Sequence, residues 1–436
     1  MNFKSLFNKD FRQTAVNQIW RLFSGPLLLI LLPIYLSPEA QGYWYTFISL
    51  AALAIFADMG FSAILLLFSA HEFAHLKFES DKTISGDEHR LTRLATLFRF
   101  SVRWSSLMAV TIFPIVLIIG YSILNAKETT TDWKLAWLIY GAASIFVFVN
   151  SMILSFIEGC NSVGDVQKIR FHISFVTFIT TLILLVSGAS LYALSLSLLV
   201  GALSGTAIIL FNYKRMLHQL HQQASSKNHP WMQETLPLMW RFAVSWISGY
   251  FIFSIFTPLA FHYYGSVEAG KVGLSLAVCT AIFSIASIWI TVITPRMSIY
   301  VAQEEQKKLN SDFKKHTFLA TLTYILGVLT LYIMAFLLEN QLPILKRLLP
   351  MSSFLIIATA YFAQLLINSM ATYMRAHKQE PLVLVSILNG IYVTSITLII
   401  AANMSFEYLF LGFLSAYIVT LPWVYIIFKN HKRASR

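Results

Sequence analysis

The sequence predicts an all-α integral membrane protein, in which about twelve transmembrane helices form two six-helix bundles around a central cavity. Three observations carry this prediction: the composition, the number of long apolar stretches and an internal repeat. Of 436 residues, 57% are hydrophobic and only 12% are charged, and the mean hydropathy is +0.66. Because about a quarter of the residues in a soluble domain are charged, the composition excludes that class.

The N-terminal segment has no small-residue cleavage site after a short apolar core, so we expect that it is not a removed signal peptide. Phe3, Leu6 and Phe7 are spaced as on one helix face among lysines, which favours a short helix on the cytoplasmic membrane surface. The two cysteines, Cys160 and Cys279, lie in or beside apolar stretches. They indicate neither a disulfide framework nor a thiolate metal site.

Twelve stretches reach the ~20 residues that are needed to cross a hydrocarbon core of ~30 Å. No segment outside them is long enough for a soluble domain. The predicted spans lie near 14–36, 43–69, 102–124, 133–157, 170–188, 191–213, 237–261, 272–294, 317–338, 348–370, 381–402 and 406–428.

Basic residues orient these spans. With the N-terminus placed in the cytoplasm, 26 of the 32 lysine and arginine residues fall in inward segments and only 5 in outward loops. The positive-inside rule therefore places both termini in the cytoplasm. The same bias accounts for the net charge of +12, so a nucleic-acid partner is not implied.

An internal repeat divides the chain into two halves. The first half contains, in order, SG (24–25), Pro33, SPEA (37–40) and AIF (54–56), and the second contains SG (248–249), Pro258, SVEA (266–269) and AIF (281–283). Each half then continues into a long basic loop, at 70–101 and at 295–316. We expect an N-terminal lobe at 1–213, a cytoplasmic linker at 214–236 and a C-terminal lobe at 237–436. Parallel repeats related by an axis along the membrane normal are typical of transporters.

Arg21 and Asp58 are ionisable residues inside the first two spans. Each lies fifteen residues from the turn that joins these spans, counted from Leu36 back and from Tyr43 forward. This separation places both charges about 22 Å from the outer face, roughly 8 Å inside the cytoplasmic edge of the core. Equal depth predicts an ion pair that faces the bundle interior. The alternative is that Trp20 and Arg21 form an interfacial anchor, with Arg21 reaching the headgroups.

Four further polar residues lie in or at the ends of spans. Arg241 follows Trp240 near the start of the seventh span, as Arg21 follows Trp20. Glu158 ends the fourth span, where it is either a solvated boundary residue or part of a pathway. Gln364 and Asn368 are four residues apart on the tenth span, and helix–helix hydrogen bonding is the simpler explanation for that stripe.

Three patterns have a functional and a structural interpretation. HEFAH (71–75) matches the HExxH zinc motif, but a helix end with histidines at the headgroups is the simpler interpretation. Lys168, Arg170 and His172 open the fifth span, where interfacial anchoring is the simpler interpretation. The aromatic stripe Trp246, Tyr250 and Phe253 packs against lipid or core, or stacks on sugar.

The chain also resembles a known family. The stretches SPEAQGYWYTF, FADMGF, FSAHEFAHL, SWISGYFIF and YYGSVEAGKVGLSL are similar to those of Wzx-type flippases for bacterial polysaccharide repeat units (O-antigen or capsule). These flippases belong to the multidrug/oligosaccharidyl-lipid/polysaccharide exporter superfamily. The resemblance implies a twelve-helix, two-lobed protein of the bacterial inner membrane that moves an undecaprenyl-pyrophosphate-linked oligosaccharide to the periplasmic leaflet by alternating access.

The resemblance also implies the partners. These are the lipid-linked glycan, membrane lipid, a coupling ion (H⁺ or Na⁺) and a polysaccharide polymerase that acts on the product. No cofactor and no enzymatic activity are expected. A pyrophosphate inside the membrane needs fixed cations, above all arginine with its forked donors, and Arg21 and Arg241 are the candidates.

Two other classes remain. A polysaccharide polymerase, ligase or glycosyltransferase needs a sizeable outward loop with catalytic residues, whereas the longest outward loops, 125–133 and 262–271, have only about ten residues. A cation-coupled drug or small-molecule antiporter of the same superfamily favours several buried acids. Asp58 is the only clear one in the sequence, but a shared fold does not determine the cargo.

Overall fold

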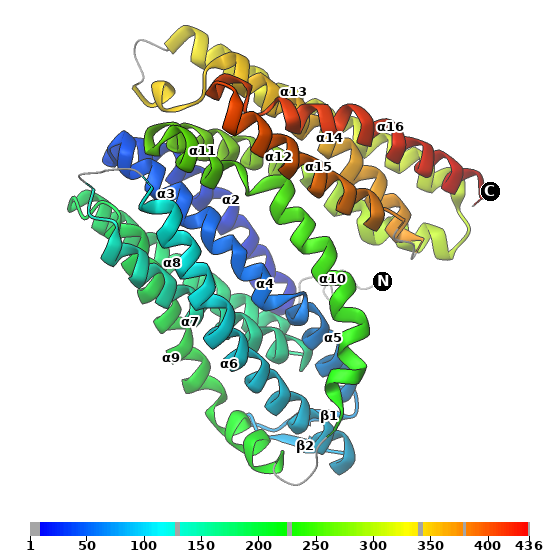
Figure 1. Ribbon diagram of the computed structural model, residues 1–436. Helices are drawn as coiled ribbons and strands as arrows, with labels where there is room; N and C mark the ends of the chain where they lie inside the picture. The colour runs from blue at the N-terminus through cyan, green and yellow to red at the C-terminus, as the bar shows by residue number, and fades with distance from the viewer. Residues whose placement is uncertain (1–8, 127–130, 225–228, 339–342, 378–380, 435–436) are drawn as a thin grey trace. The chain divides into compact units, whose positions relative to one another are not determined.

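The computed structural model describes residues 9–126, 131–224, 229–338, 343–377 and 381–434 (Figure 1). Within them, twelve helices are long and apolar enough to cross a membrane, as the sequence predicts. The surface helix that we expect at Phe3, Leu6 and Phe7 lies outside the described residues.

The helices and strands follow one another in two comparable series. The first half contains α2 (Lys9–Tyr35), α3 (Pro38–Ala51), η1 (Ala52–Ala54), α4 (Ile55–Asp58), α5 (Phe61–Phe73), β1 (Leu76–Phe78), β2 (Ile84–Gly86), α6 (Glu88–Leu124), α7 (Lys134–Gly159), α8 (Val163–Val186) and α9 (Tyr192–Gln223). The second half contains α10 (Trp231–Phe253), α11 (Phe256–Tyr264), α12 (Ser266–Ala302), α13 (Gln306–Leu338), η2 (Pro343–Arg347), α14 (Met351–Ala376), α15 (Val383–Asn403), η3 (Phe406–Tyr408) and α16 (Leu411–Ala434).

The two long basic loops expected at 70–101 and 295–316 are mostly helical. Helix α6 begins at Glu88, where Asp87 caps it by accepting a hydrogen bond from the Arg90 backbone N–H at 2.8 Å. Helices α12 and α13 extend toward each other until only residues 303–305 separate them. These segments are polar enough to resemble loops, but their Lys, Glu, Gln and Arg residues are good helix formers.

Two predicted spans are interrupted. The second span, expected to be continuous over 43–69, consists of α3, η1, α4 and α5, with a break after Asp58. The seventh span, expected over 237–261, is divided into α10 and α11. The break after Asp58 has no equivalent in the second half of the repeat. The stretch from Pro38 to Phe73 is nearly as long as its counterpart α12, but α12 is one continuous helix.

The chain folds into two compact units. One contains residues 9–24 and 47–247, and the other contains residues 25–46 and 248–434. The lobes that we expect at 1–213 and 237–436 are continuous segments. In the structure, α2, α3 and α10 each contribute residues to both units. In the first unit, α9 packs against both α7 and α8, and in the second, α14 packs against α12 and α16.

The two repeat motifs lie against each other in the second unit. The Gln41 side chain donates to the backbone carbonyl of Gly270 at 2.9 Å. A Cβ added at Gly42 would collide with the backbone carbonyl of Ser266, and one added at Gly273 would collide with the ring of Tyr45. The small residues of SPEAQG and SVEAG therefore allow the start of α3 and the start of α12 to approach closely.

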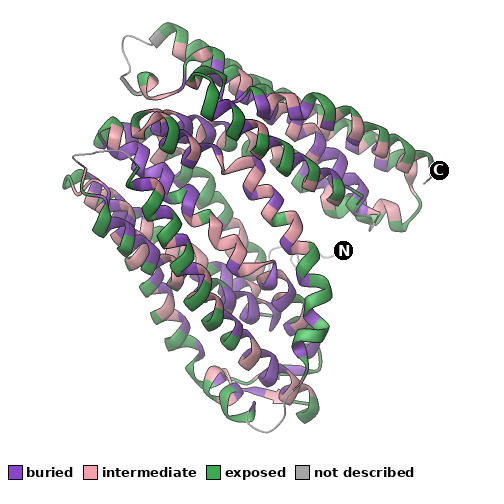
Figure 2. Cartoon of the chain, in the orientation of Figure 1, coloured by how far each residue is buried: buried purple, intermediate pink, exposed green. Residues whose placement is uncertain are grey.

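Figure 2 shows exposed residues along the helices of both units, and many of these residues are large and apolar. Val110 and Ile118 on α6, Phe211 on α9 and Ile418 on α16 are between 66% and 89% exposed. Exposed apolar surface on this scale indicates a region that contacts another apolar phase or partner. Together with the span lengths, it identifies a multi-pass membrane protein.

Topology can be checked with reporter fusions or cysteine labelling. We expect residues 77–101, 214–236 and 300–315 on the cytoplasmic side, and residues 126–132 and 263–270 outside, because of the bias in basic residues. A linker at 214–236 that is labelled from outside would contradict the arrangement in two repeated bundles. Intact vesicles treated with an impermeant thiol reagent make this measurement directly.

Candidate functional site

The break in the second span is the most unusual backbone feature of the first unit. Met59 and Gly60 both adopt left-handed backbone angles, with φ of 46° and 75°. A Cβ added at Gly60 would collide with the Cβ of Phe242 on α10. Only glycine combines this φ with this close approach, so the position of the break is determined by Gly60 and its contact with α10.

Asp58 lies at this break and caps the next helix. Its carboxylate accepts hydrogen bonds from the Ser62 backbone N–H at 3.1 Å and from the Ser62 hydroxyl at 2.5 Å. The first N–H groups of a helix have no partner within the helix, and a carboxylate at that end also interacts favourably with the helix dipole. The half-buried carboxylate is therefore held in place by α5.

The expected ion pair between Asp58 and Arg21 is not formed. Arg21 is exposed, and among the described residues no carboxylate lies within ion-pair distance of it. Its neighbour Trp20 donates to the Ser174 hydroxyl at 3.0 Å and packs on the ring of Phe178, which holds α2 against α8. The break explains the difference, because it ties Asp58 to Ser62 and not to the neighbouring span.

A cavity of about 550 Å³ opens beside the break, within the first unit. Asp58 and Ser62 line it together with residues of α7, α9 and α10. Its polar lining consists of one carboxylate, three serine hydroxyls and two aromatic side chains with polar atoms: Asp58, Ser62, Ser144, Ser151, Tyr140 and Trp246. Carboxylate and hydroxyl oxygens are ligands for a proton or for a hard cation such as Na⁺.

Sequence reasoning found Asp58 and Trp246 but not the serines that share their cavity. Ser62, Ser144 and Ser151 were missed because single serines in apolar helices are common. The run Asp58-Met59-Gly60 offered a weaker signal for the break, since an isolated glycine inside a helical pattern is unfavourable and often has a packing reason. The aromatic stripe of α10 is divided: Trp246 lines the cavity, whereas Tyr250 is buried and Phe253 packs on Tyr361 in the second unit.

Glu158 is held in a polar network between three helices. Its carboxylate pairs with Arg170 at 2.8 Å and accepts from the Gln167 side chain at 3.2 Å. The Gln167 carbonyl in turn accepts from Asn17 on α2 at 2.8 Å. Glu158 is thus a structural partner of α8 and not a solvated boundary residue. Lys168 and His172, in contrast, line a separate cavity of about 820 Å³ with Lys82.

The HEFAH motif has a structural role here. Glu72 is 2% exposed and accepts from Arg90 at 3.1 Å and from Arg93 at 2.9 Å. Helix α5 ends at Phe73, so His75 is not one turn from His71 on a continuous helix. Arg93 also lies over the Trp231 ring at 5.0 Å, and this places the start of α10 in the first unit. The carboxylate is therefore committed to two arginines and not to a metal-bound water.

The remaining predicted residues are distributed over both units. Arg241 on α10 is exposed in the first unit, and no ion pair involves it within the described part of the chain. Gln364 on α14 accepts from the Tyr417 hydroxyl of α16 at 2.9 Å, which is the helix–helix hydrogen bond that the sequence favoured. Asn368, one turn later, is half-buried on the same helix.

Comparisons with known proteins agree with this architecture. No protein-family model matches the sequence, and no curated protein matches it. Solved structures do match, over nearly the whole chain. An inward-facing multidrug resistance MATE family transporter of the MOP superfamily has a TM-score of 0.67, with 14% identity over 96% of each chain.

Two further structures are similar. The lipid II flippase MurJ, in an inward closed conformation, has a TM-score of 0.66 with 10% identity, over 95% of this chain and 87% of MurJ. A Vibrio cholerae MATE transporter has a TM-score of 0.57 with 14% identity, over 99% and 98% of the two chains. At these identities the likeness shows the fold, which is a MATE- and MurJ-like transporter fold.

Proposed function

We propose that this protein is a flippase of the bacterial inner membrane, with both termini in the cytoplasm. Its cargo is an undecaprenyl-pyrophosphate-linked oligosaccharide, which it moves from the cytoplasmic to the periplasmic leaflet by alternating access. It carries out no chemical conversion, and a polysaccharide polymerase uses the translocated repeat unit. The fold it shares with a lipid flippase and with drug transporters supports transport, and its sequence pattern supports this cargo.

The observation that carries the proposal is a pair of arginines without acidic partners. Arg21 and Arg241 lie within helices long enough to span a membrane, and neither forms an ion pair with any residue that the structure describes. An uncompensated guanidinium at such a depth is costly and marks a pathway. A pyrophosphate matches the forked donors of arginine and supplies the missing negative charge.

Asp58 supports coupling of this transport to H⁺ or Na⁺. Its carboxylate is half-buried, held by Ser62 and surrounded by hydroxyl groups of the cavity. Such a group binds a cation only when it is ionised, so occupancy of the site changes the charge at the break. Discontinuous helices are the usual place for coupling ions in transporters.

We expect Asp58→Asn to uncouple transport from the ion gradient. Asparagine is as good a cap as aspartate, so the variant keeps the break and still accepts the hydrogen bond from the Ser62 N–H. Only the charge is lost. Initial transport rates in proteoliposomes, measured with and without an imposed H⁺ or Na⁺ gradient, should then be equal and about tenfold below the driven wild-type rate. A variant that still responds to the gradient would rule Asp58 out as the ion site.

The second candidate is a cation-coupled drug antiporter. The cavity favours it, because the lining residues include a carboxylate and three aromatic side chains but no lysine or arginine. A drug cation would bind there directly, whereas a pyrophosphate would be repelled. The two candidates therefore differ in which residues contact the cargo: Asp58 and Trp246 for a drug, and Arg21 and Arg241 for the lipid-linked glycan.

Deletion of the gene in its own host distinguishes the candidates. The flippase proposal expects loss of surface polysaccharide and accumulation of lipid-linked single repeats on the cytoplasmic leaflet. Repeats that accumulate on the periplasmic leaflet instead would indicate a polymerase or ligase. Unchanged polysaccharide with increased sensitivity to cationic drugs would indicate the antiporter. Lectin accessibility of the repeats in intact and permeabilised spheroplasts reports the leaflet.

A further inference from the structure

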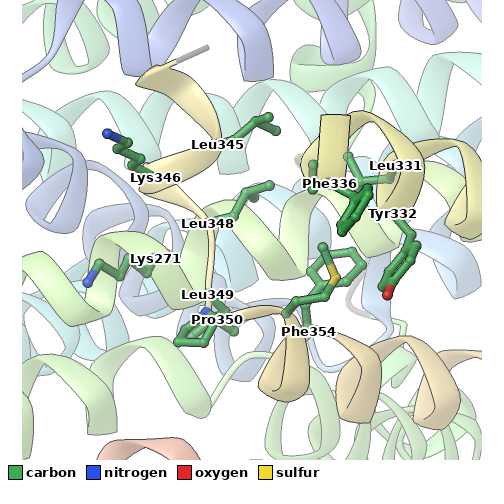
Figure 3. A pocket seen from close by; sticks show the side chains of 12 residues that line it. Lys271, Leu331, Tyr332, Phe336, Leu345, Lys346, Leu348, Leu349, Pro350 and Phe354 are labelled. Atoms are coloured by element: carbon green, nitrogen blue, oxygen red, sulfur yellow. The ribbon is translucent and has the colours of Figure 1, made fainter. Parts of the chain in front are cut away.

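A third cavity, of about 450 Å³, lies entirely within the second unit (Figure 3). It is lined by the start of α12, the end of α13, the residues around η2 and the start of α14. Figure 3 shows Lys271 and Lys346 on one side and Leu331, Tyr332 and Phe336 on the other. The cavity is therefore amphipathic, with cations at one edge and an apolar wall opposite.

The cations of this cavity are unusual for their side of the membrane. Only five lysine and arginine residues fall in segments predicted to face outward, and Lys271, Lys346 and Arg347 are three of them. Two of these three line the cavity, and its lining contains no carboxylate. Within the described residues, neither lysine forms an ion pair, and Lys271 is half-buried.

Arg347 lies outside the lining, between the lining residues Lys346 and Leu348 in sequence, and carries an unsatisfied donor. One terminal nitrogen donates to the backbone carbonyl of Leu36 at 3.0 Å. The other terminal nitrogen is buried and has no hydrogen-bond partner in the described structure. Burial also lowers the pKa of Arg347, because it disfavours the charged form. A buried cationic donor without an acceptor is a costly arrangement that an anion would relieve.

The apolar wall is suited to a hydrocarbon chain. Phe336 is 77% exposed and Tyr332 is 41% exposed, both on the last turns of α13. Aromatic side chains at this level are typical of the membrane interface, where one part of a residue contacts lipid and the other contacts water. A ligand that joins an anionic group to an apolar chain would match both sides of the cavity.

We propose that this cavity binds the phosphate group of a membrane lipid in the leaflet predicted to be outer. Lys271 and Lys346 neutralise the phosphate, Arg347 adds positive charge from outside the lining, and the chain lies along Tyr332 and Phe336. The phosphate can come from a phospholipid headgroup or from the pyrophosphate of a polyprenyl lipid. Only the polyprenyl source rests on the proposed function, so the site stands even if the cargo is a drug.

Binding of defined lipids to purified full-length protein tests the site. We would measure dissociation constants in detergent for phosphatidylglycerol, polyprenyl pyrophosphate, phosphatidylcholine and inorganic pyrophosphate. At least one of the two anionic lipids should bind about tenfold or more tighter than phosphatidylcholine and inorganic pyrophosphate. Lys271→Gln with Lys346→Gln should weaken that binding about tenfold, and Lys346→Gln alone should weaken it less.

The matched control is Lys134→Gln, which removes an exposed outward lysine from the first unit. It should change binding less than twofold. Preference for polyprenyl pyrophosphate would identify the cargo as the ligand, and equal binding of both anionic lipids would identify a general headgroup site. The proposal is overturned if phosphatidylcholine binds equally well, if the double variant binds like wild type, or if inorganic pyrophosphate binds as tightly as the lipids.

Discussion

Replacing Arg21 with alanine is expected to abolish export of the lipid-linked oligosaccharide while the amount of protein in the membrane stays unchanged. The side chain is exposed, so its removal creates no cavity. Under the proposed function, the variant loses a forked donor for the pyrophosphate, and charge-assisted hydrogen bonds contribute about 1.5–3 kcal/mol each. Losing two of them would slow translocation by at least about a hundredfold. Arg21→Lys should restore only part of the rate, because a single ammonium cannot form the paired contact.

The matched control lies on the same helix. Arg12 is also exposed on α2, nearer its N-terminal end, and Arg12→Ala should export normally.

The decisive variant combines Arg21→Leu with Asp58→Leu. Because Asp58 is bonded to Ser62 and not to Arg21, removing both charges should not restore export. Normal export by the double variant would show that Arg21 does not bind the cargo. Rates are measured in proteoliposomes as glycan that becomes accessible to a lectin.

Gly60→Ala is expected to cause a large loss of stability in the first unit. At φ of 75°, a Cβ costs about 1–2 kcal/mol through the backbone alone. The same Cβ would collide with the Cβ of Phe242, which sits directly on the α10 backbone, and overpacking of this kind costs about 1–3 kcal/mol more. Transport should also fall, because any relief of the collision shifts α10 or the break that holds Asp58.

Gly188→Ala separates the two contributions. Gly188 has almost the same φ, 78°, but a Cβ there would meet no atom within 4 Å. It should therefore show the backbone cost without the collision. Thermal unfolding in detergent, followed for both variants and wild type, should give a clearly larger decrease in Tm for Gly60→Ala. Equal decreases would mean that the contact with Phe242 does not determine where the second span breaks.

The number and approximate position of the spans were predictable from the sequence. Apolar stretches of ~20 residues are recognised locally, whatever the rest of the chain does. The motifs SPEA and SVEA likewise identified the turns at which α3 and α12 begin, and these turns prove to contact each other through Gly42 and Ser266. The hydrogen bond of Gln364 to α16 was also expected, since polar residues on a span need partners in neighbouring helices.

The sequence by itself thus determined the membrane class and the number of spans, because apolar stretches of ~20 residues are recognised locally. The equal depth of Arg21 and Asp58 stays a prediction. Only the tertiary structure decided which partners those residues have. The direction of a side chain depends on the rotation of its helix and on any break in it. Here the break requires a left-handed Gly60 packed on Phe242, a residue far away in the sequence. No local pattern encodes that contact, and it is the reason why Asp58 binds Ser62 and leaves Arg21 without an acidic partner within the described chain.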